Sequence, residues 1–171
     1  MLSFFARIIS SVIAFLFMLF PNNGNLQYSY LQQTNSPEIA ESKIIEAVTE
    51  KDIDALEAMM CLNIKQNTEN LHVKIGELLD AIDGEITEIT GKPGISYYER
   101  REDGRTINQD GIWIYIKTST STDTFFLSVI WESANTFSIE ETGIRGIALQ
   151  DPDGYSLVRI NATEGVGEWH D

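Results

Sequence analysis

Five aromatic residues are the strongest candidates for ligand contact in this sequence: Tyr97, Tyr98, Trp113, Tyr115 and Trp131. Tyrosine and tryptophan each join a large apolar surface to one hydrogen-bonding group, which suits contact with a partly apolar molecule. All five fall in runs that predict β-strands, where aromatic residues are also common for packing alone. The sequence therefore leaves two interpretations open, a binding surface and an ordinary sheet face.

Catalysis and metal binding have weaker support. His72 has no second histidine, cysteine or paired carboxylate at ligand spacing, so we expect a surface or core-edge side chain. Glu99 precedes Arg100 and Arg101, which predicts a solvated ion pair. Asp151–Gly154 begins like a calcium loop, but the later acids are absent and its proline favours a turn. We predict no catalytic residue, no metal ligand and no cofactor.

The charge balance of the chain excludes one class of partner. The 171 residues include 26 acidic and 12 basic side chains, which gives a net charge of −14. Phosphate backbones are bound mainly by lysine and arginine, so we expect no nucleic-acid partner. Cys61 is the only cysteine, so no disulfide can form within the chain. Because it ends an apolar helical pattern, we expect a buried and unreactive thiol.

The first 21 residues predict a membrane address. Leu2–Phe20 is apolar apart from three serines and Arg7. Its length is marginal for a membrane span, and no small-residue cleavage site follows it. We therefore favour an uncleaved anchor over a cleaved signal peptide, which would give a secreted protein. Because the next basic residue is Lys43, the positive-inside rule places the domain outside the cytoplasm. Residues 22–36 are polar and predict a tether.

Helices are expected in the first half of the remaining chain. Ser36 and Asp52 are typical N-caps for the first two helices, and a third helix should begin at Asn67 or Thr68. The third helix carries an apolar stripe at helical spacing, formed by Leu71, Ile75, Leu78, Leu79 and Ile82.

Strands are expected in the second half. Alternating or apolar runs predict strands over residues 85–90, 95–101, 112–117, 124–131, 143–149 and 155–160. We expect a turn at Gly91–Gly94, a polar loop over 102–111 and a long connector over 133–142. The run 124–131 is apolar on both faces, so it should be a central strand that is covered on both sides.

Together these elements predict an α+β fold: about three N-terminal helices packed on a strongly curved antiparallel sheet of five to six strands. The hydrophobic segment at residues 1–21 and the tether at 22–36 precede this single domain. The domain should span residues 37–160, and a polar tail should occupy residues 161–171.

Two sequence patterns resemble a known superfamily. They are Ala47-x-x-x-Lys51-Asp52-x-x-Ala55-Leu56 and Glu141-Thr142-Gly143-Ile144-x-Gly146-Ile147. The first, followed by an amphipathic helix and long strands, resembles the cone-shaped domain of nuclear transport factor two and ketosteroid isomerase. Both patterns are similar to an uncharacterised bacterial branch, often found as exported lipoproteins. The likeness covers about residues 38–150. This chain lacks the lipoprotein cysteine after its apolar segment, which favours an anchor over lipid attachment.

The resemblance implies a pocket at the open end of the bent sheet, with the five aromatic residues at its mouth. Enzymes of this fold place a carboxylate or histidine and a tyrosine or aspartate donor in that pocket, but the branch has no assigned activity. We expect a membrane-tethered or exported binding module that is not an enzyme. The alternative is a small-molecule enzyme of the isomerase or dehydratase kind. Expected partners are the membrane, through Leu2–Phe20, and an apolar small molecule or a protein. The sheet face also allows a homodimer.

Overall fold

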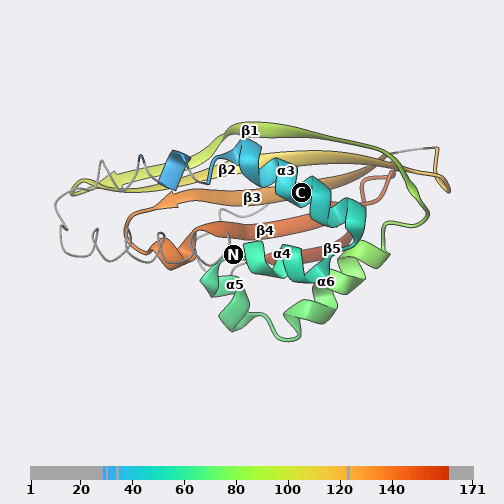
Figure 1. The fold of residues 1–171 in the computed structure, drawn as a ribbon, viewed down its shortest axis with the longest axis horizontal. Coiled ribbons are helices and arrows are strands. Elements are labelled where there is room, and N and C mark those ends of the chain that lie inside the picture. The colour runs from blue at the N-terminus through green and yellow to red at the C-terminus, as the bar shows by residue number, and fades with distance from the viewer. Residues whose placement is uncertain (1–28, 30, 34, 123, 162–171) are drawn as a thin grey trace, which may run out of the picture.

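The computed structural model describes residues 29, 31–33, 35–122 and 124–161, apart from the side chains of residues 93 and 95–97 (Figure 1). The apolar segment Leu2–Phe20, most of the tether and the tail after Asn161 lie outside the described residues. Among the helices in the described part of the chain, none combines the length and the apolar character that a membrane span requires.

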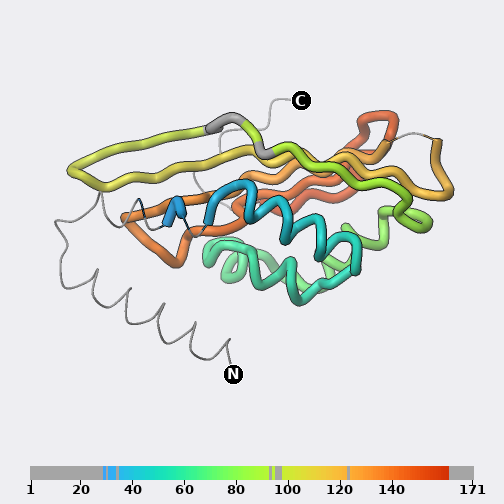
Figure 2. The backbone as a smooth tube through the Cα atoms, turned by 45° about the horizontal axis from the view of Figure 1, so that its top comes forward, coloured from blue at the N-terminus to red at the C-terminus, as the bar shows by residue number. Residues whose placement is uncertain are grey.

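Five strands form one antiparallel sheet in which every strand pairs with its neighbour in the sequence. They are β1 (Ile86–Glu102), β2 (Arg105–Thr118), β3 (Thr124–Asn135), β4 (Gly143–Gln150) and β5 (Ser156–Asn161). The helices after residue 36 lie on one side of this sheet, as Figures 1 and 2 show. The α+β class and the antiparallel sheet are therefore confirmed.

Four helices cover the sheet: α3 (Pro37–Glu50), α4 (Ile53–Met59), α5 (Leu62–Asn67) and α6 (Leu71–Asp80). Both predicted N-caps are confirmed, because Ser36 accepts a hydrogen bond from the Ile39 amide and Asp52 accepts one from the Ala55 amide. The sequence did not predict α5, a six-residue helix with a single buried side chain and therefore no periodic pattern. The third predicted helix begins later than expected, after Asn70, whose φ of 55° interrupts the helical path.

The predicted turn at Gly91–Gly94 is wrong, because β1 runs through it as one strand of 17 residues. The pairing of β1 with β2 shifts register twice between Pro93 and Tyr98. A Cβ atom added at Gly94 would lie 2.1 Å from the Gly111 carbonyl oxygen, so only glycine allows the two backbones to approach so closely. This glycine therefore marks an irregularity inside a strand rather than a turn.

Two polar segments that were expected to be loops are strand for part of their length. Residues 105–110 belong to β2, and the reversal of the chain needs only Asp103 and Gly104, whose φ angles are 50° and 73°. Positive φ at both positions is what a type I′ hairpin requires. Likewise β3 continues to Asn135, and the rest of the predicted connector contains the short 3-10 helix η1 (Ile139–Glu141).

The core lies between the helices and the inner face of the sheet, the face that the helices cover. Ile112, Ile114 and Ile116 of β2 are fully buried, whereas Trp113 and Tyr115 between them are exposed. The apolar stripe predicted on the third helix is buried at all five positions: Leu71, Ile75, Leu78, Leu79 and Ile82. Strand β3 is buried on both faces along most of its length, as its composition predicts.

The link between α4 and α5 joins the helices to the sheet through backbone groups. The Cys61 amide donates to the Ile144 carbonyl over 3.0 Å, beside an isolated bridge between Met60 and Ile144. Gly143 has a φ of 126°, and a Cβ atom there would lie 2.5 Å from the Met59 carbonyl oxygen. Cys61 is buried as predicted, and burial raises the pKa of its thiol.

Truncating the core should destabilise the domain. Leu78→Ala and Ile114→Ala each remove a fully buried side chain, so the free energy of unfolding should fall by about 2–5 kcal/mol. Urea denaturation measures this change. The matched control is Val73→Ala, because Val73 lies on the same helix as Leu78 but is 57% exposed, and we expect little change. Equal effects of Val73→Ala and Leu78→Ala would contradict the packing described here.

Candidate functional site

A pocket of about 500 Å³ lies between the N-terminal end of α3 and the inner face of the sheet. Most of the side chains that line it are polar. The lining residues are Ser29, Gln32, Gln33, Ser36, Pro37, Glu38, Gly94, Asn108, Asp110 and Ser133. They come from the segment before α3, the first turn of α3 and three neighbouring strands, so the pocket depends on the assembled fold.

Three buried polar side chains form the sheet side of this pocket. Ser133 Oγ donates to Asp110 Oδ2 over 2.7 Å. Asn108 Nδ2 lies 3.1 Å from the same Asp110 oxygen and 2.9 Å from Ser133 Oγ. None of the three is more than 7% exposed. We call Asn108, Asp110 and Ser133 the pocket triad.

The electrostatic environment of the triad disfavours a charged carboxylate. Burial is the main factor that raises the pKa of Asp110, and the nearby Glu38 carboxylate raises it further. The hydrogen bonds from Ser133 and Asn108 oppose this shift only in part. Asp110 therefore holds its proton at higher pH than an ordinary aspartate does, and a pocket carboxyl of this kind is a frequent mark of a functional site.

Trp131 is the candidate aromatic residue that supports the pocket. It is 7% exposed in the core, and its indole Nε1 donates to the Asn35 carbonyl oxygen over 2.7 Å. The Asn35 amide in turn donates to the Leu31 carbonyl oxygen. This hydrogen bond holds the segment before Ser36 and Glu38 against β3. Trp131 thereby positions the wall of the pocket that faces the triad.

Tyr98, Trp113 and Tyr115 are not among the described residues that line this pocket. Trp113 and Tyr115 alternate with buried isoleucines, so they point from the outer face of β2, and Tyr98 is also exposed. The ring of Tyr115 lies 5.3 Å from that of Phe126, between ring centroids. The side chain of Tyr97 is outside the described residues. A role of these aromatic residues in binding stays a prediction.

A second buried network lies beside the triad and holds strands together. Glu132 is 1% exposed and accepts hydrogen bonds from Gln109 and Asn135, over 2.9 Å and 2.7 Å. Arg145 Nη1 lies 3.3 Å from Glu132 Oε2 and 3.5 Å from Glu141 Oε2. Burial raises the pKa of Glu132, although the hydrogen bond from Gln109 and the charge of Arg145 oppose the rise. None of the atoms named here belongs to the residues that line the pocket.

The sequence analysis did not identify either buried network. It expected few inward-pointing acids because the acids cluster in predicted helices and turns. Asp110 lies in the segment that was taken for a loop, and Glu132 follows the last predicted residue of its strand. The one hint in the sequence is the polar run Asn108–Asp110, which lies close to the start of an apolar strand. Asparagine and aspartate are also common in turns, so this run also predicts part of a loop.

The comparison with protein families gives one match. The family model described as Domain of unknown function (DUF5104) matches residues 43–153. This range includes the pocket triad and most of the sheet, but it begins after the lining residues of the first turn of α3. A search of curated proteins found no match to this chain.

Replacing Asp110 by asparagine should change how stability depends on pH. The folded-state pKa of Asp110 is raised, so its contribution to stability is complete below the unfolded pKa and is lost as pH rises through the folded pKa. The asparagine in Asp110→Asn does not ionise, so the variant does not lose this stability as pH rises. The side-chain oxygen of the asparagine can still accept the hydrogen bonds from Ser133 and Asn108. The variant should therefore gain stability relative to wild type as pH rises above the ordinary aspartate pKa. Urea unfolding between about pH 4 and about pH 8 measures this gain.

The matched control for this measurement is Asp80→Asn, the same chemical change at an exposed position on α6. Its pH profile should run parallel to that of the wild type. A parallel profile for Asp110→Asn would show that the Asp110 carboxyl has the same pKa in the folded and unfolded chains.

Proposed function

We propose that this chain, which belongs to the family Domain of unknown function (DUF5104), is a binding module for a small polar ligand. The observation that carries the proposal is the pocket triad, a buried carboxyl with two buried hydrogen-bonding partners at the surface of a pocket of about 500 Å³. Pockets with a few convergent polar groups are the usual sites for small molecules.

The polarity of the lining indicates the class of ligand. Asp110 and Glu38 supply carboxyl groups, and the described lining residues include no lysine and no arginine. Gln32, Gln33 and Ser36 add further hydrogen-bonding groups. A ligand with an amine would supply the positive charge that such a lining lacks. The proposal thus replaces the apolar ligand expected from the aromatic residues with a small amine.

An enzyme of the isomerase or dehydratase kind is the second candidate. It is favoured by the raised pKa of Asp110, because a buried carboxyl with a raised pKa suits a group that accepts and returns a proton. The described lining residues include no histidine or tyrosine to act as the second proton-transfer group. We therefore propose binding without catalysis. On this proposal, the resemblance to ketosteroid isomerase concerns the architecture of the domain and not its activity.

A binding assay on the full chain tests the ligand class. Putrescine and ethanolamine serve as amine probes, and glucose serves as a neutral polar probe. Asp110→Asn should weaken amine binding by roughly 10–150-fold, because a hydrogen bond to a charged group contributes about 1.5–3 kcal/mol. Asp80→Asn, on the surface of α6, should leave binding unchanged. Binding of glucose alone, or amine binding that Asp110→Asn does not alter, would reject this assignment.

The proposal extends to the location of the domain. We propose that Leu2–Phe20 anchors the chain in the membrane and that the polar residues after it, up to the segment that lines the pocket, tether the domain outside the cytoplasm. The apolar segment after Arg7 and the lack of basic residues before Lys43 support this arrangement.

Protease added to intact cells should remove the domain while cytoplasmic proteins stay intact. Mass spectrometry of the protein's N-terminus then separates the two forms of export, since only a cleaved signal peptide would remove Met1–Phe20. Protection of the domain until the cells are lysed would contradict an external location.

A further inference from the structure

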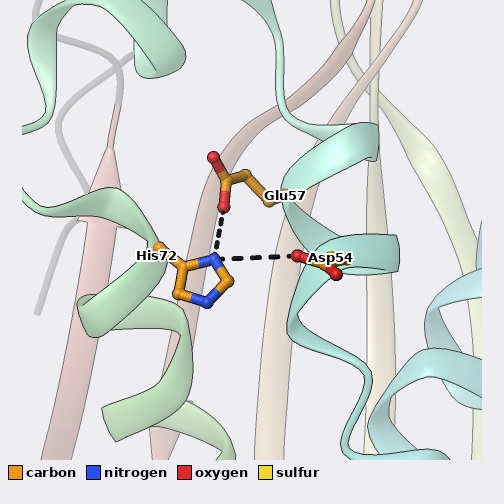
Figure 3. A group of neighbouring side chains, drawn as sticks. All are labelled: Asp54, Glu57 and His72. Carbon is orange, nitrogen blue, oxygen red and sulfur yellow. Dashed lines mark hydrogen bonds and ion pairs between the residues drawn. The ribbon is translucent and has the colours of Figure 1, made fainter.

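A histidine and two carboxylates converge on the surface of the helical layer, away from the pocket (Figure 3). Asp54 and Glu57 lie on α4, and His72 lies on the first turn of α6. His72 Nδ1 is 2.9 Å from Glu57 Oε2 and 3.8 Å from Asp54 Oδ1. The expected surface position of His72 is confirmed, because its side chain is 58% exposed. The two carboxylates come from α4, a different helix, so the spacing around His72 in the sequence did not reveal them.

The spacing of these atoms matches the first coordination shell of a transition metal. One candidate donor atom from each residue lies within 4.8 Å of the other two. Zinc binds imidazole nitrogen at roughly 2.0–2.1 Å and carboxylate oxygen at roughly 2.0–2.2 Å, so donors around one ion lie roughly 3–3.5 Å apart. We propose that Asp54, Glu57 and His72 form a binding site for Zn²⁺ or a similar divalent transition metal.

A single hydrogen bond from His72 Nδ1 can reach only one of the two carboxylates. Both carboxylates approach the same ring nitrogen, and Nδ1 can carry only one proton. That proton can serve Glu57, the nearer partner, but it leaves the Asp54 carboxylate beside a second negative group. The side chains of His72 and Asp54 are 58% and 92% exposed, and exposed ion pairs contribute little to stability. A divalent cation would neutralise both carboxylates and bind Nδ1 through its lone pair.

The surroundings leave room for the remaining ligands of the ion. The three residues border an open surface hollow of about 430 Å³, which Ala58 and Lys65 also line. Water molecules can complete the coordination there, as they do at open zinc sites. Lys65 is the one cationic side chain among the described lining residues apart from His72, and its Nζ donates to the Ala58 carbonyl oxygen over 2.9 Å. This bond directs the ammonium group to the C-terminal part of α4.

Calorimetric titration with Zn²⁺ tests the site on the full chain after treatment with a chelator. We expect one Zn²⁺ per chain. Loss of even an outer-shell partner costs about 10–100-fold in metal affinity, so His72→Gln and the double variant Asp54→Asn/Glu57→Gln should each lose at least that much. His170→Gln removes the only other histidine of the chain and should bind Zn²⁺ as the wild type does.

A second measurement guards against a folding defect in the variants. Zn²⁺ should raise the thermal midpoint of the wild type and of His170→Gln by mass action, and it should leave that of His72→Gln unchanged. The variants should share one midpoint without metal, because the changed side chains are partly or largely exposed. Absence of Zn²⁺ binding by the wild type, binding that survives His72→Gln, or binding that His170→Gln abolishes would each overturn the proposal.

Discussion

Burial of β3 on both faces is the constraint on which the rest of the structure depends. A strand that no water reaches must satisfy each of its polar groups within the protein. The C-terminal half of β3 carries Glu132 and Ser133, both nearly inaccessible, so the neighbouring strands must supply their partners. Strand β2 supplies Gln109 and Asp110, and β4 supplies Arg145. The polar ends of β2 and β4 are thus the partners that a buried central strand requires.

The two buried acids of this region solve the same problem differently. Glu132 has a cation beside it in Arg145, and the pair links β3 to β4 at the point where their register shifts. Asp110 has neutral hydrogen-bond partners, Ser133 and Asn108, and a second carboxylate, Glu38, lies near it across the pocket. Arg145 compensates the buried charge of Glu132, whereas no such cation compensates a charge on Asp110 among its hydrogen-bond partners. The pocket therefore holds the one of these two acids whose hydrogen-bond partners are all neutral.

Local chemistry let the sequence predict the elements of the fold, and long-range contacts explain what it missed. Helix caps at Ser36 and Asp52 and the stripe on α6 act within a few residues, so their patterns are visible in the sequence. Gly94 was assigned to a turn because glycine is common in turns. Its role in the structure is close contact with the Gly111 backbone of the neighbouring strand, which the local sequence does not show. The pocket triad was missed for the same reason: Ser133 meets Asp110 only after β2 and β3 have paired.

Comparing aspartate with asparagine at position 110 shows which of its properties packing and hydrogen bonding require. Asparagine there would keep an oxygen for Ser133 and Asn108 and would avoid the cost of ionising a buried group. The hydrogen bonds that Ser133 and Asn108 donate therefore do not by themselves require a negative charge at this position. An acid there is useful to a ligand that exchanges a proton with it or carries a positive charge to it. The same argument does not apply to Glu132, because replacing it with glutamine would leave Arg145 without its closest recorded carboxylate. Of the two buried acids, Glu132 has a cation beside it, and the binding function proposed above would bring a positive charge to the other.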